Sequence, residues 1–310
     1  MSGIHHVTAI AGRADRNFDF FTRVLGLRLV KKTVNFDDPG TYHLYYGDEQ
    51  GQPGTILTFF PWEHATAGHL GVGEAQETAF RIPASAVGYW THRLLEKGVT
   101  HGAPEKRFGD TVLPFTDPDG MRFALVGVPA AESENGWSTG EIPAEHAVRG
   151  FHGITLLVNK AAPTAAILTD VLGFQEVTRD GLLARYRGDA LFGAHVDLRE
   201  AGDFPRGRMG RGSVHHIAFR AVDDTAQAAM AQKLAADHHM HPTGQKDRNY
   251  FRSIYFREPN GILFEIATDQ PGFAVDESAR ELGRLLKLPR FLEPRRAELE
   301  ARLPPLHETV

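Results

Sequence analysis

Hydrophobic and polar residues alternate in short stretches along the chain, and several of these stretches are followed by a segment with helical periodicity. The order is the same in two segments, IHHVTAIAGRADRNFDFFTRVLGLRLV and FHGITLLVNKAAPTAAILTDVLGFQEV. Each predicts a strand, whose side chains point alternately to two faces, and then an amphipathic helix. The helices are expected to end near Gly26 and Gly173, because glycine suits the left-handed cap of a helix.

A second pair of segments repeats the same order, ETAFRIPASAVGYWTHRLLEKGV and HIAFRAVDDTAQAAMAQKLAADH. Their continuations, FTDPDGMRFALVG and FREPNGILFEIAT, each predict a closing strand after a hairpin turn, at Asp119-Gly120 and at Asn260-Gly261. The repeating unit is therefore a strand, a helix and three strands (βαβββ), used four times. One unit cannot bury both faces of its sheet alone, so the units must pair.

The four units divide the chain into two halves. Residues 1–128 are predicted to hold two units, at about 4–60 and 75–128, and residues 151–270 to hold two more, at about 151–200 and 213–270. Residues 129–150 lack periodicity and predict a linker. In residues 271–310, the segments SARELGRLLKL and EPRRAELEARL predict a helical tail that serves as a cover or as a contact in a homo-oligomer.

Composition narrows the class of protein without identifying it. The 310 residues are 42% hydrophobic and 24% charged, as in an ordinary soluble globular protein, and the net charge of -5 argues against nucleic-acid or anionic-membrane partners. No apolar run approaches the roughly 20 residues needed to span a bilayer, and the N-terminus has no signal-peptide pattern, so a cytoplasmic location is expected. The absence of cysteine excludes disulfides, thiolate zinc sites and cysteine nucleophiles.

Histidines recur at one position of the repeated unit and predict a metal site. His6, His152 and His216 occupy equivalent places in the first strands of three units, and Glu265 lies in the closing strand of the fourth. Two neutral imidazoles and one carboxylate are the facial set that holds a divalent metal and leaves coordination positions open. Glu265 stands between Phe and Ile, and a carboxylate buried among apolar neighbours needs a partner, which a metal would supply.

The choice of ligands depends on which units pair. Pairing the first unit with the fourth would gather His6, His216, Glu265 and a neutral Thr58. Pairing the third unit with the fourth would gather His152, His216, Glu265 and Asp197, which adds a second anionic ligand and restricts the open positions. The first set is the cleaner triad of two histidines and one carboxylate.

The repeat and its motifs resemble the vicinal-oxygen-chelate superfamily over nearly the whole chain. The motifs HHVTAI, RGFHG, VHHIAF and KDRNYFRSIYFREPNGILFE, in this order, resemble the ring-cleaving dioxygenases that act on hydroquinones. The resemblance implies an α+β fold in which four βαβββ modules pair into two open, cup-like mixed sheets with flanking helices. It also implies metal ligands from the first and fourth modules, which favours His6, whereas the catechol-cleaving arrangement would favour His152.

The function implied by this resemblance is a non-haem, Fe(II)-dependent, extradiol-type dioxygenase, with Mn(II) or another divalent ion as an alternative metal. The expected partners are a small aromatic diol, hydroquinone before catechol, and O2. One alternative is a glyoxalase-like lyase or isomerase using Zn, Ni or Mn, which would want a further carboxylate where Thr58 stands. Another is a drug-binding protein of the bleomycin-resistance kind, which would not need converging ligands.

Four further residues are candidates for the catalytic site. Tyr255 resembles the tyrosine that such enzymes place over the ring, and its phenol could hydrogen-bond a substrate oxygen. Arg248 resembles an arginine at the substrate entrance, where a permanent cation favours an ionised phenol. Thr8 shares the face of His6 and could line the cup. His215 should point away from the metal in a regular strand, although a bulge could bring it close enough to carry a proton.

Overall fold

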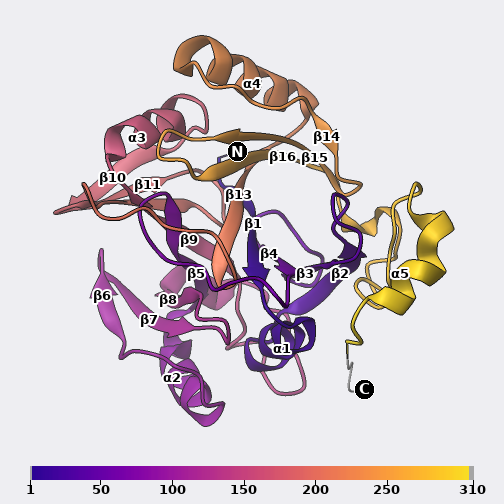
Figure 1. The fold of residues 1–310 in the computed structure, drawn as a ribbon. Coiled ribbons are helices and arrows are strands. Elements are labelled where there is room, and N and C mark those ends of the chain that lie inside the picture. The colour runs from indigo at the N-terminus through magenta and orange to yellow at the C-terminus, as the bar shows by residue number, and fades with distance from the viewer. Residues whose placement is uncertain (1, 307–310) are drawn as a thin grey trace.

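The computed structural model describes residues 2–306, and within them the chain forms two eight-stranded mixed sheets with helices on their outer faces (Figure 1). In the first sheet the strands lie in the order β14 (Lys246–Asp247), β15 (Phe251–Arg257), β16 (Leu263–Pro271), β13 (Ser213–Ala221), β1 (Ile4–Ala11), β4 (Ile56–Pro61), β3 (Tyr42–Gly47) and β2 (Arg28–Val34). The antiparallel pairing of β1 with β13 joins the first module to the fourth.

The second sheet joins the two middle modules. Its strands lie in the order β10 (Gln175–Asp180), β11 (Leu183–Arg187), β12 (His195–Glu200), β9 (Gly150–Val158), β5 (Glu74–Pro83), β8 (Arg122–Val128), β7 (Asp110–Thr116) and β6 (Glu105–Arg107). Antiparallel pairing of β5 with β9 makes the junction. The predicted fold class of four βαβββ modules in two cup-like sheets is confirmed, and the pairing of the third module with the fourth is wrong.

Each module carries its helix between its first two strands. The helices are α1 (Ala14–Asp19), which continues into a π-helical turn at Phe20–Val24, α2 (Val87–Glu96), α3 (Ala161–Asp170) and α4 (Asp224–His238). Asp223 caps α4 by accepting a hydrogen bond from the Ala226 amide, and His239 ends the helix in the left-handed conformation at φ 54°. His238 and His239 therefore lie at the C-terminus of α4.

Aromatic side chains join the two sheets into one core. Phe21, behind α1, packs on Phe59 of β4 at 4.6 Å between ring centroids and on Phe123 of β8 at 5.7 Å. Phe123 stacks in turn on Phe80 of β5. These rings belong to the first and second modules, so burying them fixes one sheet against the other.

The C-terminal tail differs from the prediction. Residues 271–306 contain one short helix, α5 (Arg296–Arg302), and two 3₁₀ turns, Phe273–Val275 and Glu293–Arg295, while residues 307–310 lie outside the described part of the chain. The segment SARELGRLLKL is not helical because Gly283 adopts φ +80° and packs against the backbone of Leu29, where a Cβ would clash.

The tail is anchored to the edge of the first sheet by a buried cation. The ammonium group of Lys31 on β2 is fully buried, binds Asp276 at 2.6 Å and also contacts the Glu277 carboxylate. The two carboxylates carry the charge opposite to that of the ammonium group, so these contacts offset the free-energy cost of burying the lysine. The tail therefore covers the side of the first module. No helix within residues 2–306 has both the length and the apolar character required to cross a membrane.

Two glycine-rich loops, 62–73 and 201–212, cross each other between the modules. At Gly71, an added Cβ would lie 2.4 Å from the Gly207 amide nitrogen and 2.4 Å from the Pro205 carbonyl oxygen, both of which are backbone atoms. The backbones can approach this closely only without side chains.

We expect Gly71→Ala to lower the free energy of unfolding by about 2 kcal/mol or more, because the two loops must separate. The matched control is Gly88→Ala in α2, where an added Cβ has no atom within 4 Å and helix propensity should slightly raise stability. Thermal and urea unfolding of both variants measure the difference. Equal stability of the two variants would contradict this account of the crossing.

Candidate metal centre

Three strands of the first sheet bring His6, His216 and Glu265 together. His6 lies on β1 and faces Ala218 of β13, and Ala218 is in register with Glu265 of β16. The three ligand atoms all lie within 4.8 Å of one another, and the three side chains are buried. Glu265 Oε2 is 2.9 Å from His216 Nε2 and 3.4 Å from His6 Nε2.

The charges of these groups suit a divalent metal. Burial raises the pKa of Glu265, but His6 and His216 outweigh it and hold this pKa well below its usual value. Burial lowers the pKa of His216, which favours a neutral imidazole. Ser253 donates a hydrogen bond to Glu265 Oε1, while Oε2 is buried and has no hydrogen bond within the described residues. A buried carboxylate oxygen that faces two imidazole nitrogens fits a cation that accepts lone pairs from all three groups.

A second histidine supports each histidine ligand. The register of β1 with β13 slips at His5 and at His215, so each of these residues sits in a bulge. His5 Nδ1 lies 2.9 Å from His6 Nδ1, and His215 Nδ1 lies 2.8 Å from His216 Nδ1. This contact orients each ligand ring, whose Nε2 then faces Glu265. The bulge at His215, considered in the sequence as an exception to a regular strand, is present.

Two members of the alternative ligand set, His152 and Asp197, lie in the second sheet and already have partners there. His152 lies on β9, where its Nε2 is 3.6 Å from Asp110 Oδ2. Asp197 accepts two hydrogen bonds from Arg185, at 2.8 and 2.9 Å. The alternative with His152 and Asp197 is therefore wrong, because the units pair first with fourth and an arginine neutralises the aspartate.

Thr58 and Thr8 complete the wall beside the metal ligands without facing the cavity. Thr58 is in register with Thr8, and Thr8 follows His6 by two residues. In the same way Glu265 is in register with Ala218, and Ala218 follows His216 by two residues. Thr58 is thus the counterpart of Glu265 in the first module. Its hydroxyl donates to Thr8 at 2.9 Å, and Thr8 is not among the described residues that line the cavity. The structure places Thr8 in the buried layer beside Thr58, and its role in the site stays a prediction.

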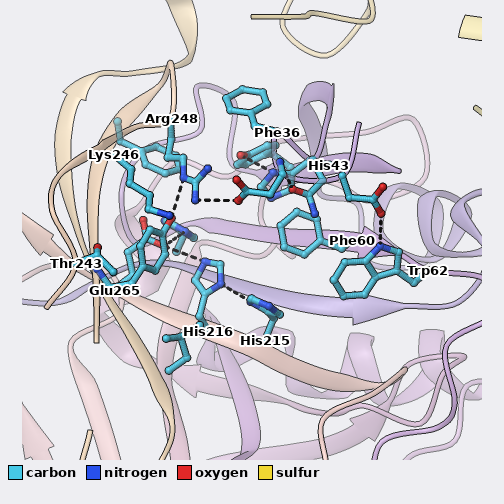
Figure 2. A pocket seen from close by; sticks show the side chains of 18 residues that line it. Phe36, His43, Phe60, Trp62, His215, His216, Thr243, Lys246, Arg248 and Glu265 are labelled. Carbon is cyan, nitrogen blue, oxygen red and sulfur yellow. Dashed lines mark hydrogen bonds and ion pairs between the residues drawn. The ribbon is translucent and has the colours of Figure 1, made fainter. Parts of the chain in front are cut away.

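A cavity of about 410 Å³ opens over His6, His216 and Glu265 (Figure 2). Its two long walls differ in character. The wall from the first module is mainly aromatic, with Tyr45, His43, Phe60, Trp62 and Phe36, and it also carries the polar residues Asn35, Asp37 and Asp38. The wall from the fourth module is mainly polar, with Thr243, Lys246, Arg248 and Tyr255 beside the apolar residues Phe251 and Leu263. His215 also lines the cavity and lies edge-on to Phe60 at 5.6 Å between centroids.

Tyr255 and Arg248 form a unit in the polar wall. Tyr255 of β15 is in register with Glu265, and Arg248 Nε donates to the Tyr255 oxygen at 3.2 Å. Arg248 also reaches the cavity-lining residue Asp37, with 3.2 Å between Nη2 and Oδ2. Burial and then the Glu265 charge raise the pKa of Tyr255, so its phenol keeps its proton near neutral pH.

Sequence reasoning missed several polar residues of the site, among them His43, Tyr45 and Ser253. His43 and Tyr45 line the cavity from β3, and Ser253 holds Glu265 from β15. The repeat contained the signal, because Tyr45 pairs with Thr58 as Tyr255 pairs with Glu265. Aligning the third strands of the first and fourth modules would have placed the two tyrosines at equivalent positions.

Comparison with known proteins agrees with the fold. Residues 3–125 and 150–266 match the Glyoxalase/Bleomycin resistance protein/Dioxygenase superfamily. The chain belongs to this superfamily. Members of it bind a divalent metal, and the centre formed by His6, His216 and Glu265 is the corresponding candidate.

Relatives that cover almost the whole chain identify the class of enzyme. MhqO of Bacillus subtilis (strain 168), assigned as a ring-cleaving dioxygenase, is 46% identical over 98% of this chain and 96% of its own. Chlorohydroquinone/hydroquinone 1,2-dioxygenase of Sphingobium indicum is 34% identical over 96% and 95%. A crystal structure from Bacillus subtilis, assigned as a dioxygenase, superposes with a TM-score of 0.94 at 45% identity and covers 99% of each chain. The superfamily member described here is accordingly an enzyme of the ring-cleaving dioxygenase class.

Proposed function

We propose that the protein uses Fe(II), held by His6, His216 and Glu265, to open the ring of a hydroquinone with O2. The observation that carries the proposal is the convergence of these three ligand atoms at the floor of a cavity with an aromatic wall. The relationship to a hydroquinone dioxygenase supports the choice of a para-diol over catechol.

A bound Fe(II) ion supplies a Lewis acid that favours an ionised phenol and a redox centre that reacts with O2. The residues around it then have separate tasks. The aromatic wall packs against the ring and excludes water, while the Arg248 cation adds to the field that favours a phenolate. Because Arg248 donates to the oxygen of Tyr255, the phenolic proton of Tyr255 is left to donate to a substrate oxygen.

His215 has a positioning role in this proposal. Burial, followed by His216 and Arg257, lowers the pKa of His215 to about 3, so the ring is neutral at neutral pH. A neutral His215 ring can contact His216 through Nδ1, while its Nε2 remains available for a different hydrogen bond. We propose that it fixes the orientation of the His216 ring through their contact at Nδ1.

We expect the Fe(II)-loaded protein to consume one O2 for each hydroquinone and to form a ring-opened acid. This expectation rests on a set of three candidate ligands that would leave coordination positions of the metal open beside a mainly aromatic cavity wall. An oxygen electrode measures the stoichiometry, and mass spectrometry with ¹⁸O2 shows whether both oxygen atoms enter the product. Turnover of a methylglyoxal–thiol adduct without oxygen uptake would instead support a lyase.

A further inference from the structure

The first and fourth modules place two tyrosines at equivalent positions of the same cavity. Tyr45 of β3 is in register with Thr58, and Tyr255 of β15 is in register with Glu265. Since Thr58 and Glu265 are themselves counterparts, Tyr45 and Tyr255 occupy matching places in opposite walls. Both line the cavity, and Tyr45 is almost fully buried.

The hydroxyl of Tyr45 belongs to a chain of hydrogen-bonding groups that runs through His43 and Thr58 to Thr8. The Thr58 hydroxyl donates to Thr8 and therefore accepts from His43 Nε2, which lies 2.7 Å away. Burial lowers the pKa of His43 well below its usual value, so the ring is neutral and carries only one proton. With that proton on Nε2, the Nδ1 atom of His43 accepts from the Tyr45 hydroxyl at 2.8 Å.

The two tyrosines consequently offer opposite hydrogen-bonding groups to the cavity. The oxygen of Tyr255 accepts from Arg248, and its proton is free to donate. The proton of Tyr45 is committed to His43, and its oxygen is free to accept. A ligand that satisfies both tyrosines needs an acceptor at one end and a donor at the other. The cavity between them is about 410 Å³ and mostly aromatic on the Tyr45 side.

We propose that the Tyr45 oxygen accepts the hydrogen bond of the second hydroxyl of a para-diol, and so selects para-diols over ortho-diols and over phenol ethers. This inference rests on the proposed function. A para-diol carries its two oxygens at opposite ends of the ring, so one can be ionised on the metal side beside Tyr255 while the other remains a donor. An ortho-diol has both oxygens on one side of the ring and leaves the Tyr45 oxygen without a donor. A buried acceptor that loses its partner weakens binding.

The test is anaerobic binding of hydroquinone and of 4-methoxyphenol to the Fe(II)-loaded protein, because the ether keeps one phenol and lacks the second donor. We expect the wild type to bind hydroquinone roughly tenfold more tightly than the ether. Tyr45→Phe should abolish this preference while keeping iron content and affinity for the ether. Tyr46→Phe is the matched control, since Tyr46 lies on the same strand and donates to Asn17 outside the cavity.

A second variant tests the direction of the hydrogen bonds. Thr58→Val preserves side-chain volume but removes the acceptor of the His43 proton, so His43 can carry its proton on Nδ1 and donate to Tyr45. The preference for hydroquinone should fall although Tyr45 is intact. If Tyr45→Phe retains the preference, or if Thr58→Val leaves it unchanged, the inference is overturned. Oxygen uptake distinguishes failure of the proposed function from failure of this inference. A wild type that consumes no oxygen with any diol refutes the proposed function. An active wild type together with a Tyr45→Phe variant that keeps the preference for hydroquinone refutes only this inference.

Discussion

Glu265→Ala is expected to remove stoichiometric binding of a divalent metal, with a loss of affinity of roughly 100-fold or more. Glu265 is the one anionic ligand of the centre, and its Oε2 lies within 3.4 Å of both imidazole Nε2 atoms. His6→Ala and His216→Ala should have the same effect, since each removes one of the neutral donors. Metal content after anaerobic loading and desalting, measured by plasma mass spectrometry, gives the result.

His152→Ala is the matched control for the metal experiment. His152 is a buried histidine at the equivalent place of the third module, but it lies in the other sheet beside Asp110. Its removal should leave metal content unchanged, while circular dichroism confirms that all variants are folded. If His152→Ala lost its metal and His6→Ala kept it, the assignment of the centre to the first and fourth modules would be wrong.

Tyr255→Phe is expected to slow ring opening on the order of 100-fold at saturating substrate, with iron content unchanged. The change removes only the phenolic hydroxyl, and the ring still packs beside His216, at 5.8 Å between centroids. Loss of this one proton donor should therefore lower the turnover rate more than the free energy of unfolding. Steady-state oxygen uptake, with iron measured in the same sample, checks this.

The control for Tyr255→Phe is Tyr250→Phe, a nearby tyrosine whose hydroxyl donates to Asp276 in the C-terminal tail. Losing that hydrogen bond should affect the stability of the tail contact and leave oxygen uptake close to wild type. An unchanged rate in Tyr255→Phe would remove this tyrosine from the mechanism and leave Arg248 as the main polar candidate of the same wall.

The lyase alternative is disfavoured by one residue of the first module. Such an enzyme would want a further carboxylate at the metal, and the position equivalent to Glu265 is Thr58. The hydroxyl of Thr58 is engaged with His43 and Thr8. A neutral, already bonded side chain supplies neither the charge nor the base that this chemistry needs.

The repeats in the sequence were sufficient to predict the four modules, because alternation and helical periodicity are local properties of the chain. They also placed His6 and His216 at equivalent positions of two first strands, and Glu265 on the closing strand of the fourth module. The tail shows the limit of local reasoning. SARELGRLLKL has helical periodicity, yet Gly283 bends there because the tail packs against Leu29 and is bound by Lys31.

Two features of the site also lay beyond the sequence. The bulges at His5 and His215 arise from shifts in the register of β1 with β13, two strands far apart in the chain. Each bulge brings the imidazole of His5 or His215 into contact with that of the following histidine. The hydrogen-bond direction from Tyr45 through His43 depends on Thr58 meeting Thr8 across two strands.

The sequence by itself determined the fold of each module and the chemistry of the candidate ligands, since both follow from residue type and spacing. Only the tertiary structure decided that the first module pairs with the fourth. Pairing the third module with the fourth would bury a similar sheet edge, and the periodicity of the residues does not distinguish the two arrangements. That single choice brought His6 to Glu265 and left His152 beside an aspartate already bound to Arg185.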